Sequence, residues 1–376
     1  MKVVTVVGTR PEVIKLSRVI HELDQHTRQV LVHSGQNYDY QLNEVFFQQL
    51  GIRRPDHFLK AAGGSTAQTI GLVISRSDEV FALEKPDALL LLGDTNSCLC
   101  AISAKRRKIP IFHMEAGNRC FDDRVPEEIN RRIVDHISDI NLTYTEHARR
   151  YLLAEGLRPE RIVKTGSPMK EVLEFHAARI EASGVLSELG LEAGQFFVAS
   201  AHREENVDSE VNFGHLLATL SAVAERFDLP IVVSTHPRTR KRLEETNQAA
   251  LDPRIRFLEP LGFFEYVKLQ KTAKCVLSDS GTLTEESSIL DFPAVTLRQA
   301  HERPEGMDEG TLIMCGLEAP QVLKAIEVVL AHHQEASRRT FSMVADYDTD
   351  TVSKKVLRIM LSYTDYVNRV VWSKGH

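Results

Sequence analysis

The chain has 376 residues, of which 43% are hydrophobic and 26% are charged, so its composition is that of an ordinary globular protein. This composition excludes disordered, collagen-like and disulfide-scaffold proteins, and the length predicts two domains at about 150 residues each. The net charge is −6 without any run of Lys or Arg, which argues against a nucleic-acid partner. The longest apolar run, residues 88–92, is too short to cross a membrane, and no signal-like leader precedes the first expected strand. We therefore expect a cytoplasmic protein without a membrane partner.

The five cysteines form an odd set that contains no C-x-x-C pair. We expect neither a disulfide framework nor a zinc site, and we interpret the cysteines as reduced, mostly buried thiols. No cofactor and no metal are expected, because no dinucleotide fingerprint G-x-G-x-x-G occurs either.

Short β-branched runs alternate with amphipathic helical segments along nearly the whole chain, a pattern typical of an α/β fold with parallel sheets. A first series of expected strands comprises residues 3–7, 30–33, 88–92, 111–113, 140–143 and 162–164. Between the early strands, residues 11–24 and 42–50 have helical spacing, and Pro11 stands at an N1-like position.

A second series of expected strands comprises residues 196–200, 231–234, 255–257, 275–277 and 294–297. The polar, helical stretch 170–194 between the two series is a plausible interdomain connection. We predict two Rossmann-like domains, 1–185 and 186–350, that face one another across a cleft, and a C-terminal helical segment, 351–376, that could pack on either domain. In such folds ligands bind at the carboxyl ends of the strands.

The first expected strand ends in Gly8, and Arg10 and Lys15 follow on the helix. A glycine turn that opens a helix is an anion-binding shape, and both cations would add positive charge to it. These residues alone fit a plain strand-to-helix turn with a solvated arginine equally well.

Two acidic residues follow neighbouring hydrophobic strands, Asp94 after residues 88–92 and Glu115 after residues 111–113. Asp94 could simply be the N-cap of the next helix, a common role. Glu115 is harder to explain in this way, because a carboxylate directly after a buried strand must be paired or used.

The segment 126–132, PEEINRR, has helical spacing. For Glu128 and Arg132 we favour surface ion pairing of small energy. Glu127, in the first turn, could instead face the cleft. Three carboxylates in one partly desolvated site would raise the pKa of at least one of them, as general acid and base catalysis requires.

In the second domain His202 and His236 each follow a strand, which favours contact with a phosphate-bearing ligand, although a lone histidine is usually structural. The segment 278–286, SDSGTLTEE, is the most specific local pattern. Its small residues would let a diphosphate approach a helix start, and a glutamate one turn later could accept both ribose hydroxyls.

Taken together, these motifs resemble the non-hydrolysing UDP-N-acetylglucosamine 2-epimerases, which have a GT-B-like pair of Rossmann domains. The resemblance covers nearly the whole chain and rests on these segments: GTRPE at 8–12 with Lys15, GDT at 93–95, EAG at 115–117, PEE at 126–128 with Asn130 and Arg131, HR at 202–203, DSG at 279–281 with Glu285 and Glu286, and ERPE at 302–305.

The resemblance implies an isomerase that takes a UDP-sugar and works as a homodimer. It implies that Asp94, Glu115 and Glu127 are the acid/base carboxylates, with His202 and Arg131 assisting. It further implies a UDP-binding set that contains Arg10, Lys15, Ser280, Gly281 and Glu286, to which we add Gln36, Arg203, His236, Thr282 and Arg303.

The chain departs from the common epimerases at Thr282, where a second glycine is usual, and at residues 118–125, where the segment is shorter and contains Cys120 and Phe121. The second departure resembles the UDP-N-acetyl-L-fucosamine synthases of capsule and O-antigen assembly, which invert C2 of UDP-2-acetamido-2,6-dideoxy-L-talose. The alternative substrate is UDP-N-acetylglucosamine, giving UDP-N-acetylmannosamine. Alternatives from other classes are a GT-B glycosyltransferase and a non-catalytic UDP-sugar-binding protein.

Overall fold

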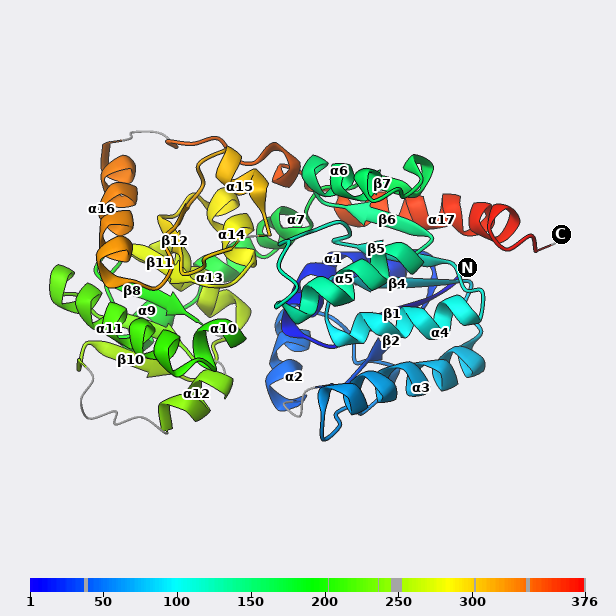
Figure 1. Ribbon diagram of the computed structural model, residues 1–376, viewed down its shortest axis with the longest axis horizontal. Coiled ribbons are helices and arrows are strands. Elements are labelled where there is room, and N and C mark those ends of the chain that lie inside the picture. Colours follow the sequence, from blue (N-terminus) through cyan, green and yellow to red (C-terminus); the bar gives the residue numbers. More distant parts are fainter. Residues whose placement is uncertain are drawn as a thin grey trace. The chain divides into compact units, whose positions relative to one another are not determined.

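The computed structural model describes residues 1–36, 40–201, 203–235, 237–244, 252–300, 302–335 and 339–374. The chain divides into two compact units, one of residues 1–175 and 346–376 and the other of residues 176–345 (Figure 1). Each unit is a parallel sheet with helices on both faces, and each is described by itself below.

In the part of the first unit that the structure describes, seven parallel strands form one sheet in the order β3-β2-β1-β4-β5-β6-β7. The strands are β1 Lys2–Val7, β2 Arg28–His33, β3 His57–Phe58, β4 Ala88–Leu92, β5 Ile111–Met114, β6 Ile140–Thr143 and β7 Ile162–Lys164. The helices are α1 Arg10–His26, α2 Tyr40–Gln49, α3 Thr66–Glu84, η1 Asn96–Cys100, α4 Ala101–Arg106, α5 Pro126–Ile137, α6 Glu146–Ala154, η2 Pro159–Arg161, α7 Met169–Phe175 and α17 Val352–Val370.

The described part of the second unit holds six parallel strands in the order β10-β9-β8-β11-β12-β13. These are β8 Phe197–Ser200, β9 Ile231–Ser234, β10 Ile255–Leu258, β11 Cys275–Ser278, β12 Ala294–Thr296 and β13 Ile313–Met314. The helices are α8 Ala177–Glu181, α9 Val185–Leu189, α10 Glu204–Val207, α11 Glu210–Phe227, α12 Pro237–Glu244, α13 Phe263–Thr272, α14 Thr282–Leu290, α15 Pro304–Asp308 and α16 Ala319–Glu335, and η4 Ala345–Tyr347 spans the return to the first unit.

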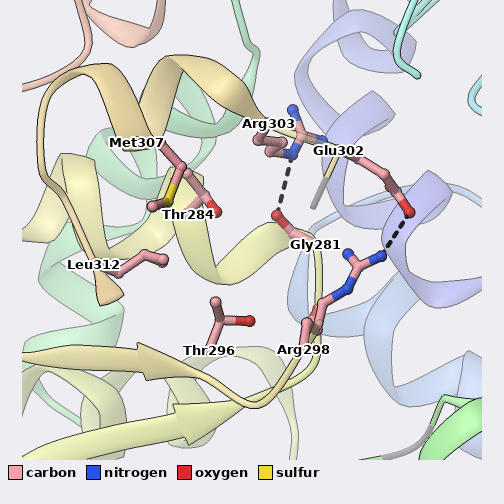
Figure 2. A pocket seen from close by; sticks show the side chains of 9 residues that line it. Gly281, Thr284, Thr296, Arg298, Glu302, Arg303, Met307 and Leu312 are labelled. Atoms are coloured by element: carbon pink, nitrogen blue, oxygen red, sulfur yellow. Dashed lines mark hydrogen bonds and ion pairs between the residues drawn. The ribbon is translucent and has the colours of Figure 1, made fainter. Parts of the chain in front are cut away.

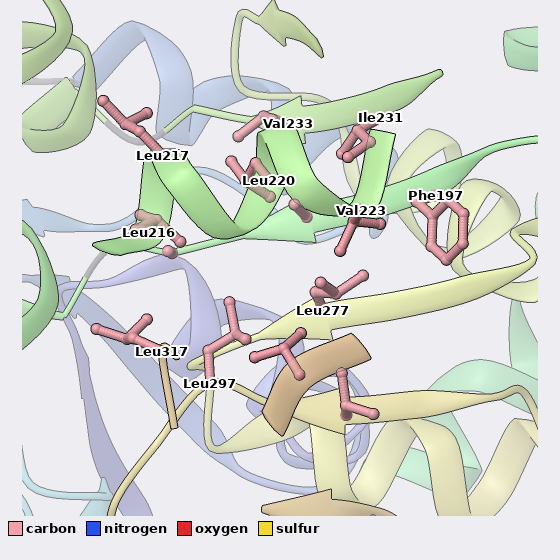
Figure 3. Packing of buried hydrophobic residues seen from close by; sticks show 14 of the residues in the cluster. Phe197, Leu216, Leu217, Leu220, Val223, Ile231, Val233, Leu277, Leu297 and Leu317 are labelled. Carbon is pink, nitrogen blue, oxygen red and sulfur yellow. The ribbon is translucent and has the colours of Figure 1, made fainter. Parts of the chain in front are cut away.

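Alternate residues of each buried strand face opposite layers of the core, as the pleat of a strand requires. On β8 of the second unit, Phe197 packs in a cluster with α11 and α16, whereas Val198 packs with α9, α13 and α14. Figure 3 shows Leu220 and Val223 of α11 among strand residues of the first of these clusters, with Val233 above them in the view and Leu277 below. The unbroken hydrophobic runs of the sequence are therefore strands covered on both faces.

The predicted fold class, α/β with two Rossmann-like units, is confirmed. The expected strands appear at nearly the expected bounds, but the short edge strands β3 and β13 were not expected. Two-residue strands carry too little pattern to be recognised in a sequence.

The division between the units falls after Phe175 rather than near residue 185. Helices α8 and α9 lie in the stretch that we interpreted as a connection, and both pack on α13 of the second unit. The returning segment begins at Asp346, before the expected residue 351, because Asp346 accepts hydrogen bonds from the Glu146 amide (2.8 Å) and the Lys164 ammonium (2.7 Å). Helix α17 then packs on α1.

All five cysteines are buried with free thiols. No helix among the described residues combines the length and the apolar character that a membrane crossing needs.

Candidate active site

In both sheets the strand order reverses between two central strands, β1 and β4 in the first unit and β8 and β11 in the second. Ligands of open α/β sheets bind beyond the carboxyl ends of strands at such a reversal, because the loops there diverge and leave helix N-termini exposed. The residues selected from the sequence follow these strands: Arg10 and Lys15 after β1, Asp94 after β4, Arg203 after β8 and Ser280 after β11.

The turn after β1 allows only glycine at position 8. A Cβ at Gly8 would lie 2.0 Å from the Ser97 Oγ and 2.2 Å from the Ser34 Oγ, far inside van der Waals contact. These two hydroxyls are themselves hydrogen-bonded at 2.8 Å. The ends of β1 and β2 and the start of η1 are therefore packed against one another around this glycine.

The carboxylate of Glu12 fills this turn. Its Oε2 accepts hydrogen bonds from the backbone amides of Gly8 (2.5 Å) and Thr9 (2.8 Å), and its Oε1 accepts one from the Thr95 hydroxyl (2.5 Å). We expected this turn to offer its amides to an external anion, but these two amides bind the protein's own carboxylate instead. The amides of Gly8 and Thr9 are therefore already occupied by a side chain of the same turn.

Burial raises the pKa of the Glu12 carboxyl to about 7, because the cost of desolvating the charge exceeds the effect of the hydrogen bonds from Thr95, Gly8 and Thr9. From the sequence alone we considered Glu12 only as part of the GTRPE motif. The available signal was a glutamate at the N3 position, which is the capping-box position.

Asp94 is held by helix α5. Its carboxylate accepts hydrogen bonds from the Arg131 guanidinium, one of them from Nε at 3.0 Å, and its carbonyl accepts one from Asn130 Nδ2 at 2.9 Å. The N-cap interpretation of Asp94 is wrong, because Thr95 caps η1 by accepting a hydrogen bond from the Ser97 amide. The Asp94 carboxylate is thus held beside the Arg131 guanidinium.

Glu115 forms the second carboxylate–cation pair. Its Oε2 lies 2.9 Å from the Lys15 ammonium, and its Oε1 accepts a hydrogen bond from Asn118 Nδ2 at 3.3 Å. The Lys15 side chain is 3% exposed and that of Glu115 is 13% exposed. Glu115 also has a backbone φ of +62°, which residues other than glycine rarely adopt. The surrounding structure must therefore stabilise the turn after β5 in this conformation.

Glu127 lies exposed in the first turn of α5, and Glu128 next to it is fully buried. The prediction that Glu128 lies at the surface is therefore wrong. The predicted pairing with Arg132 is present, because Arg132 Nη2 donates a hydrogen bond to Glu128 Oε1 at 3.1 Å. Glu128 Oε2 also accepts hydrogen bonds from Arg131 Nη1 (3.0 Å) and the Cys120 amide (3.1 Å). Glu128 thus positions Arg131, which in turn binds Asp94.

In the second unit the loop between β11 and α14 forms one wall of a pocket (Figure 2). Arg303 Nε donates a hydrogen bond to the Gly281 carbonyl (3.0 Å), and Arg298 pairs with Glu302 (3.1 Å). The pocket is lined by Ser280, Gly281, Thr284, Thr296, Arg298, Glu302, Arg303, Met307 and Leu312. Three of these, Ser280, Gly281 and Arg303, belong to the predicted binding set, whereas Arg298 was not predicted.

Several buried contacts hold this loop in place. Asp279 Oδ2 accepts hydrogen bonds from the Arg203 amide and from Asn206 Nδ2, both at 3.0 Å. Arg203 Nη2 also pairs with Glu302 at 3.1 Å. These contacts connect the loop to the residues that follow β8.

The two glutamates of α14 differ in their partners. Glu285 is fully buried and pairs with Arg303 at 3.0 Å. Glu286 is 8% exposed and accepts a hydrogen bond from Gln270 Nε2 at 2.6 Å. Thr282 shares a hydrogen bond of 3.0 Å with the Ser280 hydroxyl.

Gln36 is partly buried after β2. His202 and His236 lie outside the described residues, so their predicted roles stay predictions. Within the described parts of the chain, no group of three or more His, Cys, Asp or Glu side chains is arranged to hold a metal ion.

Comparison with known proteins identifies the family. Residues 21–361 match the family described as UDP-N-acetylglucosamine 2-epimerase. The chain belongs to this family. Its named relatives are isomerases, and the chain is accordingly an enzyme of that class.

Among solved structures, the epimerase is similar to the UDP-N-acetylglucosamine 2-epimerase from Rickettsia bellii, with 56% identity over the whole of both chains and a TM-score of 0.93. It is also similar to the UDP-GlcNAc 2-epimerase of Methanocaldococcus jannaschii in complex with UDP-GlcNAc and UDP. That match has 32% identity, covers 96% of this chain and 100% of the other, and has a TM-score of 0.89.

A third relative differs in the sugar that it is named for. The UDP-2,3-diacetamido-2,3-dideoxy-D-glucuronate 2-epimerase of Pseudomonas aeruginosa is 34% identical over 88% of this chain and 92% of its own length. The family therefore includes proteins named for more than one UDP-sugar.

Proposed function

We propose that this epimerase inverts C2 of UDP-2-acetamido-2,6-dideoxy-L-talose and produces UDP-N-acetyl-L-fucosamine, with UDP leaving and returning during the reaction. The observation that carries the proposal of C2 chemistry is the pair of carboxylates at the ends of adjacent strands. Asp94 and Glu115 follow β4 and β5, and each is held beside a cation.

The chemistry explains why several carboxylates are needed. C2 of such a sugar has no adjacent carbonyl, so its proton is only weakly acidic. If UDP leaves C1 as a carboxylate removes the C2 proton, a 2-acetamidoglycal forms and the electrons of the C–H bond become the C1–C2 double bond. UDP then adds back to C1 while C2 receives a proton on the other face. Two faces need two proton-handling groups.

We assign these roles to Asp94, Glu115 and Glu127, with His202 assisting. Arg131 and Lys15 hold the first two carboxylates in fixed positions through hydrogen bonds at 3.0 Å and 2.9 Å. Fixed geometry is valuable here, because misplacement of a reacting group by about 1 Å costs about 10²-fold in rate.

The departing diphosphate develops negative charge that fixed donors must stabilise. In the second unit we assign this role to Ser280, Gly281 and Thr282 at the start of α14. Arg303 holds this segment in place by donating a hydrogen bond to the Gly281 carbonyl. Glu286, at 8% exposure, is assigned to the ribose hydroxyls. Arg203 completes this set.

The choice of a 6-deoxy sugar rests on the segment 118–125 between Glu115 and α5. Phe121 is 66% exposed and stacks edge-on against Tyr151 at 5.2 Å between ring centroids. Cys120 is buried, and its sulfur lies 3.4 Å from a Glu128 oxygen. Phe121 is therefore the residue of this segment that could meet a C6 methyl, which an aromatic ring accepts more readily than a hydroxymethyl.

The second candidate substrate is UDP-N-acetylglucosamine, which is favoured by the names of the Rickettsia and Methanocaldococcus relatives. The test is to incubate the purified enzyme with each nucleotide sugar and to read the product by NMR, with Asp94→Asn as the inactive control. Faster inversion of the 6-deoxy-L-talose compound supports the proposal, and faster conversion of UDP-N-acetylglucosamine overturns the substrate assignment. UDP binding with neither sugar epimerised would favour a binding protein instead.

A further inference from the structure

A buried histidine lies beneath the turns that carry the two strand-end carboxylates. His113 is on β5, two residues before Glu115, and is completely inaccessible to solvent. Its Nε2 is 2.6 Å from the Gly93 carbonyl oxygen, and its Nδ1 is 2.9 Å from Asp135 Oδ1. The histidine therefore joins the turn before Asp94 to helix α5.

These two contacts determine the protonation of the ring. A carbonyl oxygen has no proton to give, so Nε2 must be the donor to Gly93. The partner of Nδ1 is a carboxylate whose Oδ2 already accepts hydrogen bonds from Arg119 Nη1 (2.7 Å) and from the Gly117 amide (3.1 Å). The positive charge of Arg119 favours the ionised form of this carboxyl, so the proton between Oδ1 and Nδ1 lies on Nδ1. An imidazole that donates from both nitrogens carries a positive charge.

The surrounding charges agree with this protonation. Asp135 is fully buried and has a lowered pKa: burial opposes ionisation, but the bonds and charges of His113 and Arg119 outweigh it. The pKa of His113 is raised, because Asp135, the Gly93 carbonyl and the charge of Asp94 together outweigh desolvation.

Asp135 also fixes the second carboxylate-bearing turn. Gly117 has φ of +82°, and a Cβ there would lie 2.5 Å from the Ala148 carbonyl oxygen. The backbone conformation after Glu115 therefore requires glycine at this position. The amide of Gly117 donates to Asp135, on the same helix as Arg131. One buried acid–base pair thus connects the Asp94 turn, the Glu115 turn and the helix that carries Glu127.

We propose that His113 is an imidazolium in the working enzyme and is a positioning residue for catalysis. Together with Asp135 it holds the Gly93–Asp94 and Glu115–Gly117 turns in register with α5. The buried cation also favours the ionised form of Asp94 by attraction across the Gly93 turn. The catalytic part of this inference rests on the proposed function, whereas the protonation state does not.

The first test measures the protonation state of the His113 ring by NMR. In protein labelled with ¹⁵N-histidine, the signals of His113 are assigned among the 15 histidines by their loss in His113→Gln. An imidazolium has similar shifts at both nitrogens, and we expect this pattern to persist at about pH 7.5 and above, where an ordinary histidine is neutral. Two widely separated shifts at neutral pH would show a neutral tautomer and overturn the proposal.

The second test measures turnover. We expect His113→Gln, with UDP affinity retained, to lower kcat by about 10²-fold with little change in KM, because the carboxylates are displaced while binding is not. The matched control is His57→Gln, since His57 also hydrogen-bonds a carboxylate, Glu84, at 2.8 Å in the same unit. A folded His113→Gln variant with unchanged kcat would overturn the positioning role.

If His113→Gln does not fold, the variant Asp135→Asn tests the same proposal. Asp135→Asn keeps the shape but removes the charge that retains the proton, so His113 should become neutral near pH 8 and kcat should fall. An imidazolium pattern unchanged in Asp135→Asn would contradict the argument. If the unaltered enzyme epimerises no UDP-sugar, the proposed function fails on its own, and the NMR measurement still decides the protonation of His113.

Discussion

The carboxylate of Glu12 accepts a hydrogen bond of 2.5 Å from the hydroxyl of Thr95, and this bond joins the first turn of α1 to the turn that follows β4. The two residues are far apart in the sequence, but β1 and β4 are adjacent parallel strands, so their carboxyl ends meet. The bond connects the turn that carries Arg10 to the one that carries Asp94.

Stability should depend on pH through Glu12. The pKa of its carboxyl is about 7 in the folded protein, against 4.5 for an exposed glutamate, so between these values the folded state holds a proton that the unfolded state has released. The free energy of unfolding therefore falls as pH rises through this window. Glu12→Gln, which cannot ionise, should gain on the order of 3 kcal/mol relative to the parent between pH 5 and pH 8.

Urea unfolding of both proteins at each pH measures this difference, and Glu79→Gln on the exposed face of α3 is the control. A difference between Glu12→Gln and the parent that stays constant with pH would show that Glu12 does not titrate in this range.

The Lys15–Glu115 pair should show strong coupling, because both side chains are largely buried. Lys15→Met leaves the Glu115 carboxylate without its cation and should destabilise the protein by about 3 kcal/mol. The double variant Lys15→Met/Glu115→Gln should be less destabilised than the sum of the single variants by about 1–3 kcal/mol. Chemical denaturation of the four proteins completes the cycle, and additive effects would mean that the pair contributes no interaction energy.

A pair of glycine substitutions should have opposite effects. Gly8→Ala places a Cβ against the hydroxyls of Ser97 and Ser34 and should destabilise the protein by about 1–3 kcal/mol. Gly71→Ala, in the interior of α3, meets nothing within 4 Å and should stabilise the protein by about 0.5–1 kcal/mol. Thermal unfolding compares the two, and equal effects would contradict the packing of the β1 turn.

Solvent hydrogen should enter the product. If epimerisation passes through a glycal, product formed in heavy water carries deuterium at C2. Asp94→Asn, Glu115→Gln and Glu127→Gln should each lower turnover by about 10²-fold or more if the residue transfers a proton. One of these variants could release UDP and glycal without completing the inversion, which mass spectrometry detects. Retention of the original C2 hydrogen would contradict proton exchange with solvent and the roles assigned to the three carboxylates.

Glu286→Ala should weaken UDP binding by about 1–3 kcal/mol, because charge-assisted hydrogen bonds to the ribose would be lost. Calorimetric titration measures the affinity, with Glu318→Ala, a surface residue paired with His215, as the control. Glu285 is unsuitable as a control, because it is buried against Arg303 and its removal would disturb the loop itself. Unchanged affinity in Glu286→Ala would remove this residue from the binding site.

Much of the fold follows from local pattern. The run 88–92 is apolar at every position, which in a chain of this composition means a strand covered on both faces, and β4 has those bounds. The same reasoning located Asp94 and Glu115, because a polar residue directly after such a run lies at the carboxyl edge of the sheet. Strand β3 escaped prediction because its two residues, His57 and Phe58, have no periodicity.

The sequence by itself determined which elements form and which residues stand at their ends, since hydrophobic periodicity and turn residues act over a few positions. Only the tertiary structure decided the partners: Lys15 with Glu115, Arg131 with Asp94, and His113 with Asp135. Such pairs depend on which strands lie side by side and on how α5 packs over them, and desolvation then fixes the charges. For that reason Glu128 is buried, although the sequence predicts a surface residue. His113, which the sequence shows only as part of a strand, is the buried imidazolium that we propose beneath the carboxylates.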